Sequence, residues 1–205
     1  MKKFLGVIVV IIAAIAVYWF FIKPKDKKTE VSEKQQPIKL KSHSDSFNNA
    51  TEAAVGSYLE MKDAFVNADT ATVKAKAREF MILIDSIPYS EIKNDQANIA
   101  EAVKSTVSDI KANTAALISQ NNIEEMRKNF SSVSDLLYPG FLKMINYEGK
   151  KLYLQHCPMA FNDEIGANWL SASDEVVNPY LGKKHPKYKA GMLNCGEVMD
   201  SISTP

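Results

Sequence analysis

The sequence predicts a mostly α-helical fold: an up-and-down antiparallel four-helix bundle with a loop-rich C-terminal cap, preceded by one transmembrane helix. Three observations predict it: an uncharged apolar run at residues 4–22, four amphipathic stripes of helical period between residues 46 and 147, and a tail rich in Pro, Gly and Asn. The chain has 205 residues, of which 46% are hydrophobic, enough for one domain with extensions.

The apolar run forms the predicted anchor, residues 1–23. At about 1.5 Å per residue it reaches roughly 28 Å, which matches the hydrocarbon thickness of a bilayer. A cleaved signal peptide is the alternative, but bulky Tyr18, Trp19 and Phe20 stand where a small-residue cleavage site is expected. Lysines flank both sides of the run, so the positive-inside rule does not decide its orientation.

A tether and a bundle follow the anchor. Residues 24–45 are rich in Lys, Glu, Gln and Ser and predict a flexible tether, because they bury too little apolar surface to fold. Residues 46–147 carry four stripes that advance in steps of three and four, as one face of a helix does. Short connections between such helices indicate antiparallel neighbours. The stripe positions are Phe47, Ala50, Ala54, Tyr58, Met61 and Phe65; Val73, Ala77, Phe80, Ile84 and Ile87; Ile99, Val103, Val107, Ile110, Thr114 and Leu117; and Ile123, Met126, Phe130, Val133, Leu137, Phe141 and Met144.

Two signals mark helix ends within this region. Pro88 is expected to stop the second helix, since proline lacks the backbone N–H that a helix interior needs. Asn122 is expected to cap the fourth helix, with Glu125 three residues later completing a capping box.

Charge and motifs exclude several classes of function. The chain has 25 Lys and Arg against 24 Asp and Glu, which gives no electrostatic reason to expect nucleic acid. It contains no Gly-rich phosphate loop, no nucleophile elbow and no His-Glu-x-x-His motif. We therefore do not expect an enzyme.

Residues 148–205 form the predicted cap of the same domain, with a short strand at 151–156 and with Trp169 and Leu170 as apolar anchors. Soft ligand atoms gather in this cap, and thiolate and thioether sulfur select soft metals, Cu(I) first of all. The candidate metal ligands are Cys157, Met159, Met192 and Cys195, with His156 as an auxiliary ligand. The alternative is a structural disulfide between the two cysteines, which are the only ones in the chain.

The cap motifs resemble the DUF3347 family, a domain of unknown function that also occurs at the C-terminus of some periplasmic adaptor subunits of copper and silver efflux systems. The resemblance extends over residues 46–200. Its most specific motifs are Cys157-Pro158-Met159, Gly166-Ala167, Trp169-Leu170-Ser171, Asn178-Pro179-Tyr180 and Cys195-Gly196-Glu197-Val198. Two departures are an inserted KKHPKYKAG before Met192, which puts the ligand set in doubt, and the lack of an adaptor hairpin.

The resemblance implies a domain outside the cytoplasmic membrane and an association with copper handling. The expected protein is thus a single-pass protein of the inner membrane whose domain faces the periplasm. It binds Cu(I) through the cap and passes it to an envelope metal-transport protein. The alternative is an envelope interaction module that binds no metal and whose two cysteines form a structural disulfide.

Overall fold

The computed structural model describes residues 43–94 and 97–202. The predicted anchor and nearly all of the predicted tether lie outside these residues. None of the helices in residues 43–94 and 97–202 has the length and hydropathy needed to cross a membrane.

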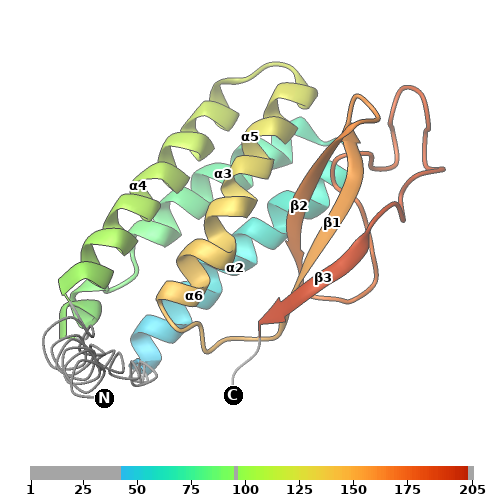
Figure 1. The fold of residues 1–205 in the computed structure, drawn as a ribbon. Coiled ribbons are helices and arrows are strands. Elements are labelled where there is room, and N and C mark those ends of the chain that lie inside the picture. Colours follow the sequence, from blue (N-terminus) through green and yellow to red (C-terminus); the bar gives the residue numbers. More distant parts are fainter. Residues whose placement is uncertain (1–42, 95–96, 203–205) are drawn as a thin grey trace, which may run out of the picture. The chain divides into compact units, whose positions relative to one another are not determined.

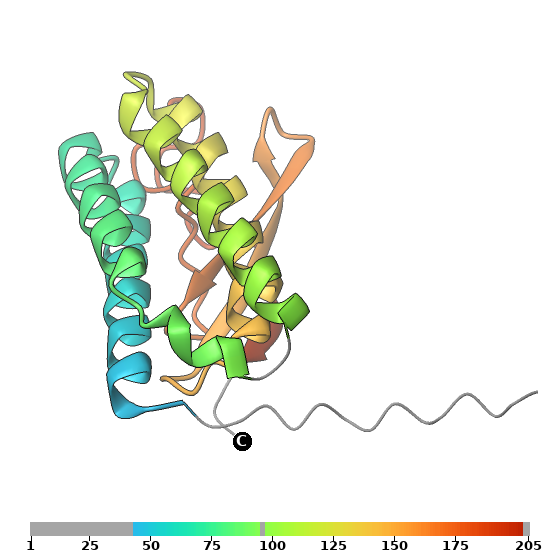
Figure 2. The same cartoon turned by 90° about the vertical axis from the view of Figure 1, so that its left-hand side faces the viewer.

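Four long helices form the main body of the described chain: α2 (Asp45–Val66), α3 (Thr70–Asp85), α4 (Ala97–Ser119) and α5 (Ile123–Asp135). Helices that follow one another in the chain pack side by side, as Figures 1 and 2 show. The predicted stripe residues face the common core. The mostly helical fold class is thereby confirmed.

Short polar side chains begin three of these helices. The Ser44 hydroxyl accepts from the Phe47 N–H, Asp69 accepts from the Thr72 N–H, and Asn122 accepts from the Glu124 N–H at 2.8 Å. The Asn122 cap was predicted. The predicted capping box is absent from the described contacts. The Glu125 carboxylate does not return to the Asn122 backbone and instead pairs with Lys128, one turn further along.

The fourth stripe was predicted as one continuous helix, and this was wrong. Helix α5 ends at Asp135 and is followed by η3 (Leu136–Phe141), a π-helical turn, and by α6 (Leu142–Met144). Tyr138, which precedes Pro139 across a cis peptide bond, has extended backbone angles (φ −138°, ψ 129°). A proline ring disfavours the helical region for the residue before it, which accounts for the break.

The predicted loop-rich cap contains a three-stranded antiparallel sheet. Strands β1 (Leu152–Phe161), β2 (Ile165–Ser171) and β3 (Glu197–Ile202) lie in the order β2-β1-β3. Only the start of β1 was predicted. Figure 1 shows the sheet beside α5 and α2, with the loop between β2 and β3 extending past it. The sheet and the helices together make up the described fold.

Aromatic side chains join the helices to the sheet. Phe130 of α5 stacks on Tyr58 of α2 at 5.1 Å and lies 5.9 Å from Tyr180, which in turn lies 5.9 Å from Trp169 of β2. The Tyr58 hydroxyl also accepts from the Leu170 N–H at 3.1 Å. Trp169 and Leu170 are fully buried, so they anchor the cap to the helices as expected. Burial raises the pKa of Tyr58 well above its ordinary value.

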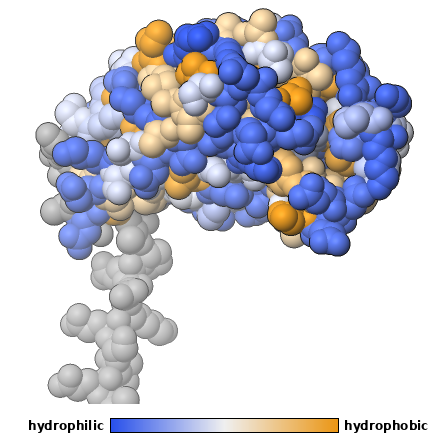
Figure 3. All heavy atoms as spheres, turned by 90° about the horizontal axis from the view of Figure 1, so that it is seen from above, coloured by the Kyte–Doolittle hydropathy of each residue, from blue (hydrophilic) through white to orange (hydrophobic). Residues whose placement is uncertain are grey.

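One face of the described domain is mainly hydrophilic. On the face drawn in Figure 3, hydrophilic residues predominate and strongly hydrophobic ones lie apart from one another. Large exposed hydrophobic side chains within the described residues are Ile82, Ile165, Val198 and Met199. They come from α3, β2 and β3, and scattered exposure of this kind is normal for a folded domain.

Replacing Gly56 by Ala is expected to stabilise the fold. Gly56 lies in the middle of α2, and a methyl group there has no neighbour within 4 Å. Alanine loses less backbone entropy on folding, so the free energy of unfolding should rise by about 0.5–1 kcal/mol in urea titrations. Gly182→Ala is the opposite control, because Gly182 has φ +56° and its added Cβ would lie 2.8 Å from the Val66 carbonyl oxygen. A destabilised Gly56→Ala variant would contradict the prediction.

Candidate functional site

Cys157 and Cys195, the two candidate cysteine ligands, meet inside the cap. Cys157 is in β1 and fully buried, and Cys195 is half-buried just before β3. Their Sγ atoms lie 2.9 Å apart, without a disulfide bond between them. This separation exceeds a disulfide bond of about 2.05 Å. We call these two residues the dithiol pair.

Asn178 holds the loop that carries Cys195. Its side chain donates to the Cys195 carbonyl at 2.8 Å and accepts from the backbone N–H groups of Tyr180 and Leu181. Its own backbone N–H donates to the Leu193 carbonyl at 2.8 Å. Asn178 is 0% exposed, so these bonds are shielded from water.

A glycine permits the close approach of Cys195 to β1. Gly196 has φ +136°, and a Cβ there would lie 2.5 Å from the carbonyl oxygen of His156. A larger residue therefore cannot follow Cys195 without moving the strand. Gly196 belongs to the Cys-Gly-Glu-Val motif, and its role is to let the backbone of Cys195 approach that of Cys157.

The other candidate ligands are placed differently. Met192 precedes Cys195 by one turn, closed by a 3.1 Å bond from the Cys195 N–H to the Met192 carbonyl. Met159 follows Cys157 by two residues in β1, and both methionines pack against the core. Each thiol thus has a methionine close to it in the sequence.

His156 points to the other face of the sheet, because successive strand residues alternate in direction. Its Nδ1 lies 2.8 Å from Asn168 Oδ1, and the Asn168 amide donates to Asp135 at 2.8 Å. Because that amide group faces Asp135, Asn168 offers His156 its oxygen, so the imidazole carries its proton on Nδ1. The structure does not bring His156 to the dithiol pair.

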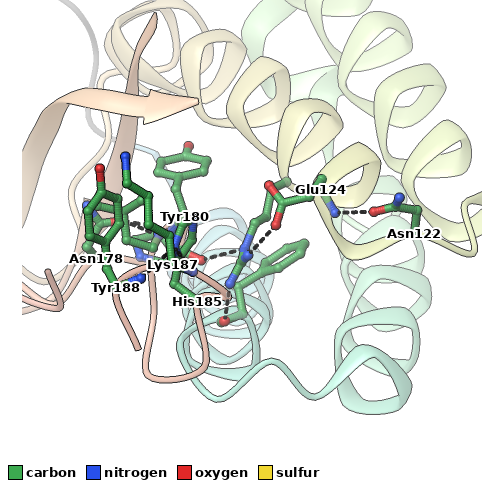
Figure 4. Close-up of polar contacts among 11 residues, drawn as sticks. Asn122, Glu124, Asn178, Tyr180, His185, Lys187 and Tyr188 are labelled. Atoms are coloured by element: carbon green, nitrogen blue, oxygen red, sulfur yellow. Dashed lines mark hydrogen bonds and ion pairs between the residues drawn. The ribbon is translucent and has the colours of Figure 1, made fainter. Parts of the chain in front are cut away.

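The inserted KKHPKYKAG segment leaves the pair in place. It packs on the turn between β1 and β2, where Lys187 pairs with Asp163 and the Tyr188 hydroxyl donates to the same carboxylate at 2.7 Å. These two bonds hold the pKa of Asp163 below its ordinary value. His185 stacks on Tyr188 at 5.0 Å, and Figure 4 shows both residues beside Lys187. The insertion extends outward, so Cys195 still reaches Cys157.

Arg127 of α5 supports the loop between β2 and β3, and its role was not predicted from the sequence. Its side chain is 2% exposed and donates to the Pro179 carbonyl at 3.1 Å, to the Phe65 carbonyl at 3.4 Å and to Glu124 at 2.9 Å. Burial lowers the pKa of the guanidinium, and Glu124 opposes this effect. Figure 4 shows Glu124 at the start of α5, facing the loop. The only sequence signal was the position of Arg127 next to the fourth stripe.

The comparison with known families agrees with the resemblance stated above. Residues 54–146 match the DUF3347 family model. That family is described as a protein of unknown function. No curated protein and no solved structure matches the chain.

The DUF3347 match covers most of α2 and all of the helices up to α6, and it ends before β1. The dithiol pair, Asn178 and Gly196 therefore lie outside the matched residues. The motifs that carry the resemblance are all C-terminal to the DUF3347 match, in the sheet and the loop that follows it.

The electrostatics of the pair bear on metal binding. Burial, followed by the neighbouring Cys157 thiol, raises the pKa of Cys195 to about 12. Cys195 is thus protonated at neutral pH. A thiol binds metal as the thiolate, so a metal ion must displace this proton.

The 2.9 Å separation of the sulfurs lies between the values that two chemical states require. Thiolate–metal bonds of about 2.3 Å require two sulfurs on one metal to lie about 3.5–4.6 Å apart. A disulfide requires about 2.05 Å. Within residues 43–94 and 97–202, no three His, Cys, Asp or Glu side chains converge on a common point. A metal here would depend on sulfur ligands.

Asp200 anchors the strand that follows the pair. The Tyr138 hydroxyl donates to Asp200 at 2.5 Å, the Ser201 N–H donates at 2.8 Å, and Lys143 lies 3.4 Å away. Together these contacts, with the Tyr138 bond first, lower the pKa of Asp200. They connect β3 to the kinked end of the helical region.

We expect Asp200→Asn to change the response to acid. A carboxylate whose pKa is lowered by folding stabilises the protein above its unfolded pKa of about 3.9, and this stabilisation disappears as pH falls through the folded pKa. In urea titrations the difference in unfolding free energy between wild type and Asp200→Asn should be constant near neutral pH and shrink below about pH 4. A difference that is equal at pH 7 and at the acid end would contradict this.

Proposed function

We propose that the reduced dithiol pair binds a soft metal ion, Cu(I) first of all, in a membrane-anchored protein of the cell envelope. The observation that supports the proposal is the convergence of two free thiols to 2.9 Å in a partly buried position. Thiolate and thioether sulfur prefer Cu(I), and Met159 and Met192 supply thioethers near each cysteine in the chain.

The proposal places the helical region as an up-and-down antiparallel bundle that supports the cap. The single N-terminal span would hold this domain on the periplasmic side of the inner membrane. There the site would take up Cu(I) and pass it to an envelope metal-transport protein. The resemblance to domains of metal-efflux adaptors supports this part of the proposal.

A Cu(I) titration of the reduced full-length chain in detergent, against a chromophoric Cu(I) chelator, tests the proposal. Cys157→Ser and Cys195→Ser should each weaken binding by about tenfold or more, since each removes a ligand. His156→Ala is the matched control and should bind as the wild type does, because the imidazole lies on the other face of the sheet. The affinity of the wild type should rise with pH, because Cys195 must lose its proton. Equal affinity in the wild type and both serine variants would sink the proposal.

The second candidate is an interaction module with a structural disulfide. It is favoured by the same 2.9 Å contact, from which the sulfurs need to approach by about 0.9 Å to form the bond. Mass spectrometry of protein isolated without reductant, after alkylation of free thiols, separates the candidates. A fully oxidised chain that resists reduction and binds no Cu(I) supports the module. A chain that is alkylated at both cysteines supports the metal site.

A further inference from the structure

A cavity of about 380 Å³ opens between α4 and η2 (Tyr89–Asn94), away from the dithiol pair. Its volume falls in the range of small-molecule sites, about 300–1,000 Å³. The residues that line it are Asp85, Tyr89, Ile92, Ala100, Val103, Lys104, Val107, Ser108 and Lys111. They come from the end of α3, from η2 and from one side of α4.

The floor of the cavity is apolar and formed by buried side chains. Val103 and Val107 of α4 and Ile92 of η2 are each less than a tenth exposed. Tyr89 adds a wall, and its hydroxyl is fixed by donating to the Ile84 carbonyl at 2.8 Å. These residues belong to the packed core, so an apolar ligand would meet a surface that is already ordered.

The rim of the cavity is cationic. Lys104, Ser108 and Lys111 follow one another at helical spacing along α4 and therefore lie on one side of it. Lys111 is neutralised by Asp85, whose two oxygens lie 2.7 and 2.6 Å from its Nζ. Lys104 is exposed and is in none of the ion pairs of residues 43–94 and 97–202. Because Lys111 and Asp85 neutralise each other, the Lys104 ammonium is the one uncompensated charge among the described lining residues.

We propose that this cavity binds a small organic carboxylate with an apolar body, such as an arylacetate. The ring or chain would lie on Val103, Val107 and Ile92, and the carboxylate would meet the Lys104 ammonium and the Ser108 hydroxyl. An anion bonded to a lysine gains a charge-assisted hydrogen bond, whereas a cation would be repelled. The proposal is independent of the metal site.

The test uses three ligands of the same shape: phenylacetate, 2-phenylethanol and phenethylammonium. Binding to the purified full-length chain in detergent is measured by ligand-observed NMR, with detergent alone subtracted. We expect saturable binding of phenylacetate, about tenfold weaker binding of the alcohol, and no binding of the ammonium ion, since a charge-assisted bond to the ligand is lost or reversed. Equal binding of all three, or no binding of phenylacetate, overturns the proposal.

Two variants locate the site. Lys104→Gln should weaken phenylacetate about tenfold and leave 2-phenylethanol unchanged, since only the charge is removed. Lys184→Gln, which alters an exposed lysine of the inserted segment, is the control and should leave both unchanged. Ala100→Leu narrows the cavity and should weaken both ligands. Each variant is first checked for wild-type thermal unfolding, and full phenylacetate binding by Lys104→Gln and Ala100→Leu contradicts the assignment.

Discussion

Replacement of Arg127 by Met is expected to lower the free energy of unfolding by about 3 kcal/mol, because it removes a buried cation whose partners stay behind. The Pro179 carbonyl loses the 3.1 Å bond that Arg127 donates, and this oxygen is shielded from water. The Phe65 carbonyl retains the Ala68 N–H as a donor, and Glu124 can turn to water, so these two partners lose less. Urea titration of the full-length chain measures the effect.

The neighbouring Lys128→Met is the matched control. Lys128 is exposed and, among the described residues, pairs only with the exposed Glu125, so its loss should change stability by less than about 0.5 kcal/mol. Arg127→Lys should fall between, since an ammonium retains the charge and cannot present the planar set of donors that reaches two elements. If Arg127→Met costs no more than Lys128→Met, the guanidinium does not support the loop.

Replacement of Asn178 by Ala is expected to destabilise the fold by about 2–4 kcal/mol and to free Cys195. Three groups lose their partner at once, namely the partly buried Cys195 carbonyl and the buried N–H groups of Tyr180 and Leu181. Each buried unsatisfied group costs about 1–3 kcal/mol, and partial relaxation of the loop reduces the sum. The stability change is measured by urea titration.

The effect on the dithiol pair has its own measurement. In Asn178→Ala the Cys195 thiol should react faster with an alkylating reagent in the folded protein, because the loop no longer holds it against Cys157. Asn194→Ala is the matched control, since its side chain donates only to the Val176 carbonyl at an exposed site. Unchanged alkylation of Cys195 in a destabilised Asn178→Ala variant would show that Asn178 stabilises the cap without positioning the thiol.

The helical part of the fold was predictable from sequence because its signals are local. Residues such as Tyr58, Phe130 and Val103 recur at the helical period, and each helix forms its backbone bonds within itself. Asn122 is likewise readable because a cap acts within two or three residues. Pro139 is a sequence signal for a break, but the apolar positions on both sides of it continue the helical period and therefore predicted one unbroken helix.

The sheet and the candidate site depend on contacts between distant residues. Strand β3 pairs with β1 from 41 to 50 positions further along the chain, and its own six residues are nearly all exposed, so no alternation marks it. Arg127 reads as a surface residue until the loop at Pro179 covers it. The same loop carries Cys195, so its position decides whether the two cysteines meet.

The sequence by itself determined which chemistry the cap can supply, since it contains the only two thiols of the chain and two methionines near them in the chain. Only the tertiary structure decided that Cys157 meets Cys195 and that His156 faces away. The physical reason is that residue types set ligand preference, whereas their meeting depends on strand pairing, on Asn178 and on the close approach at Gly196.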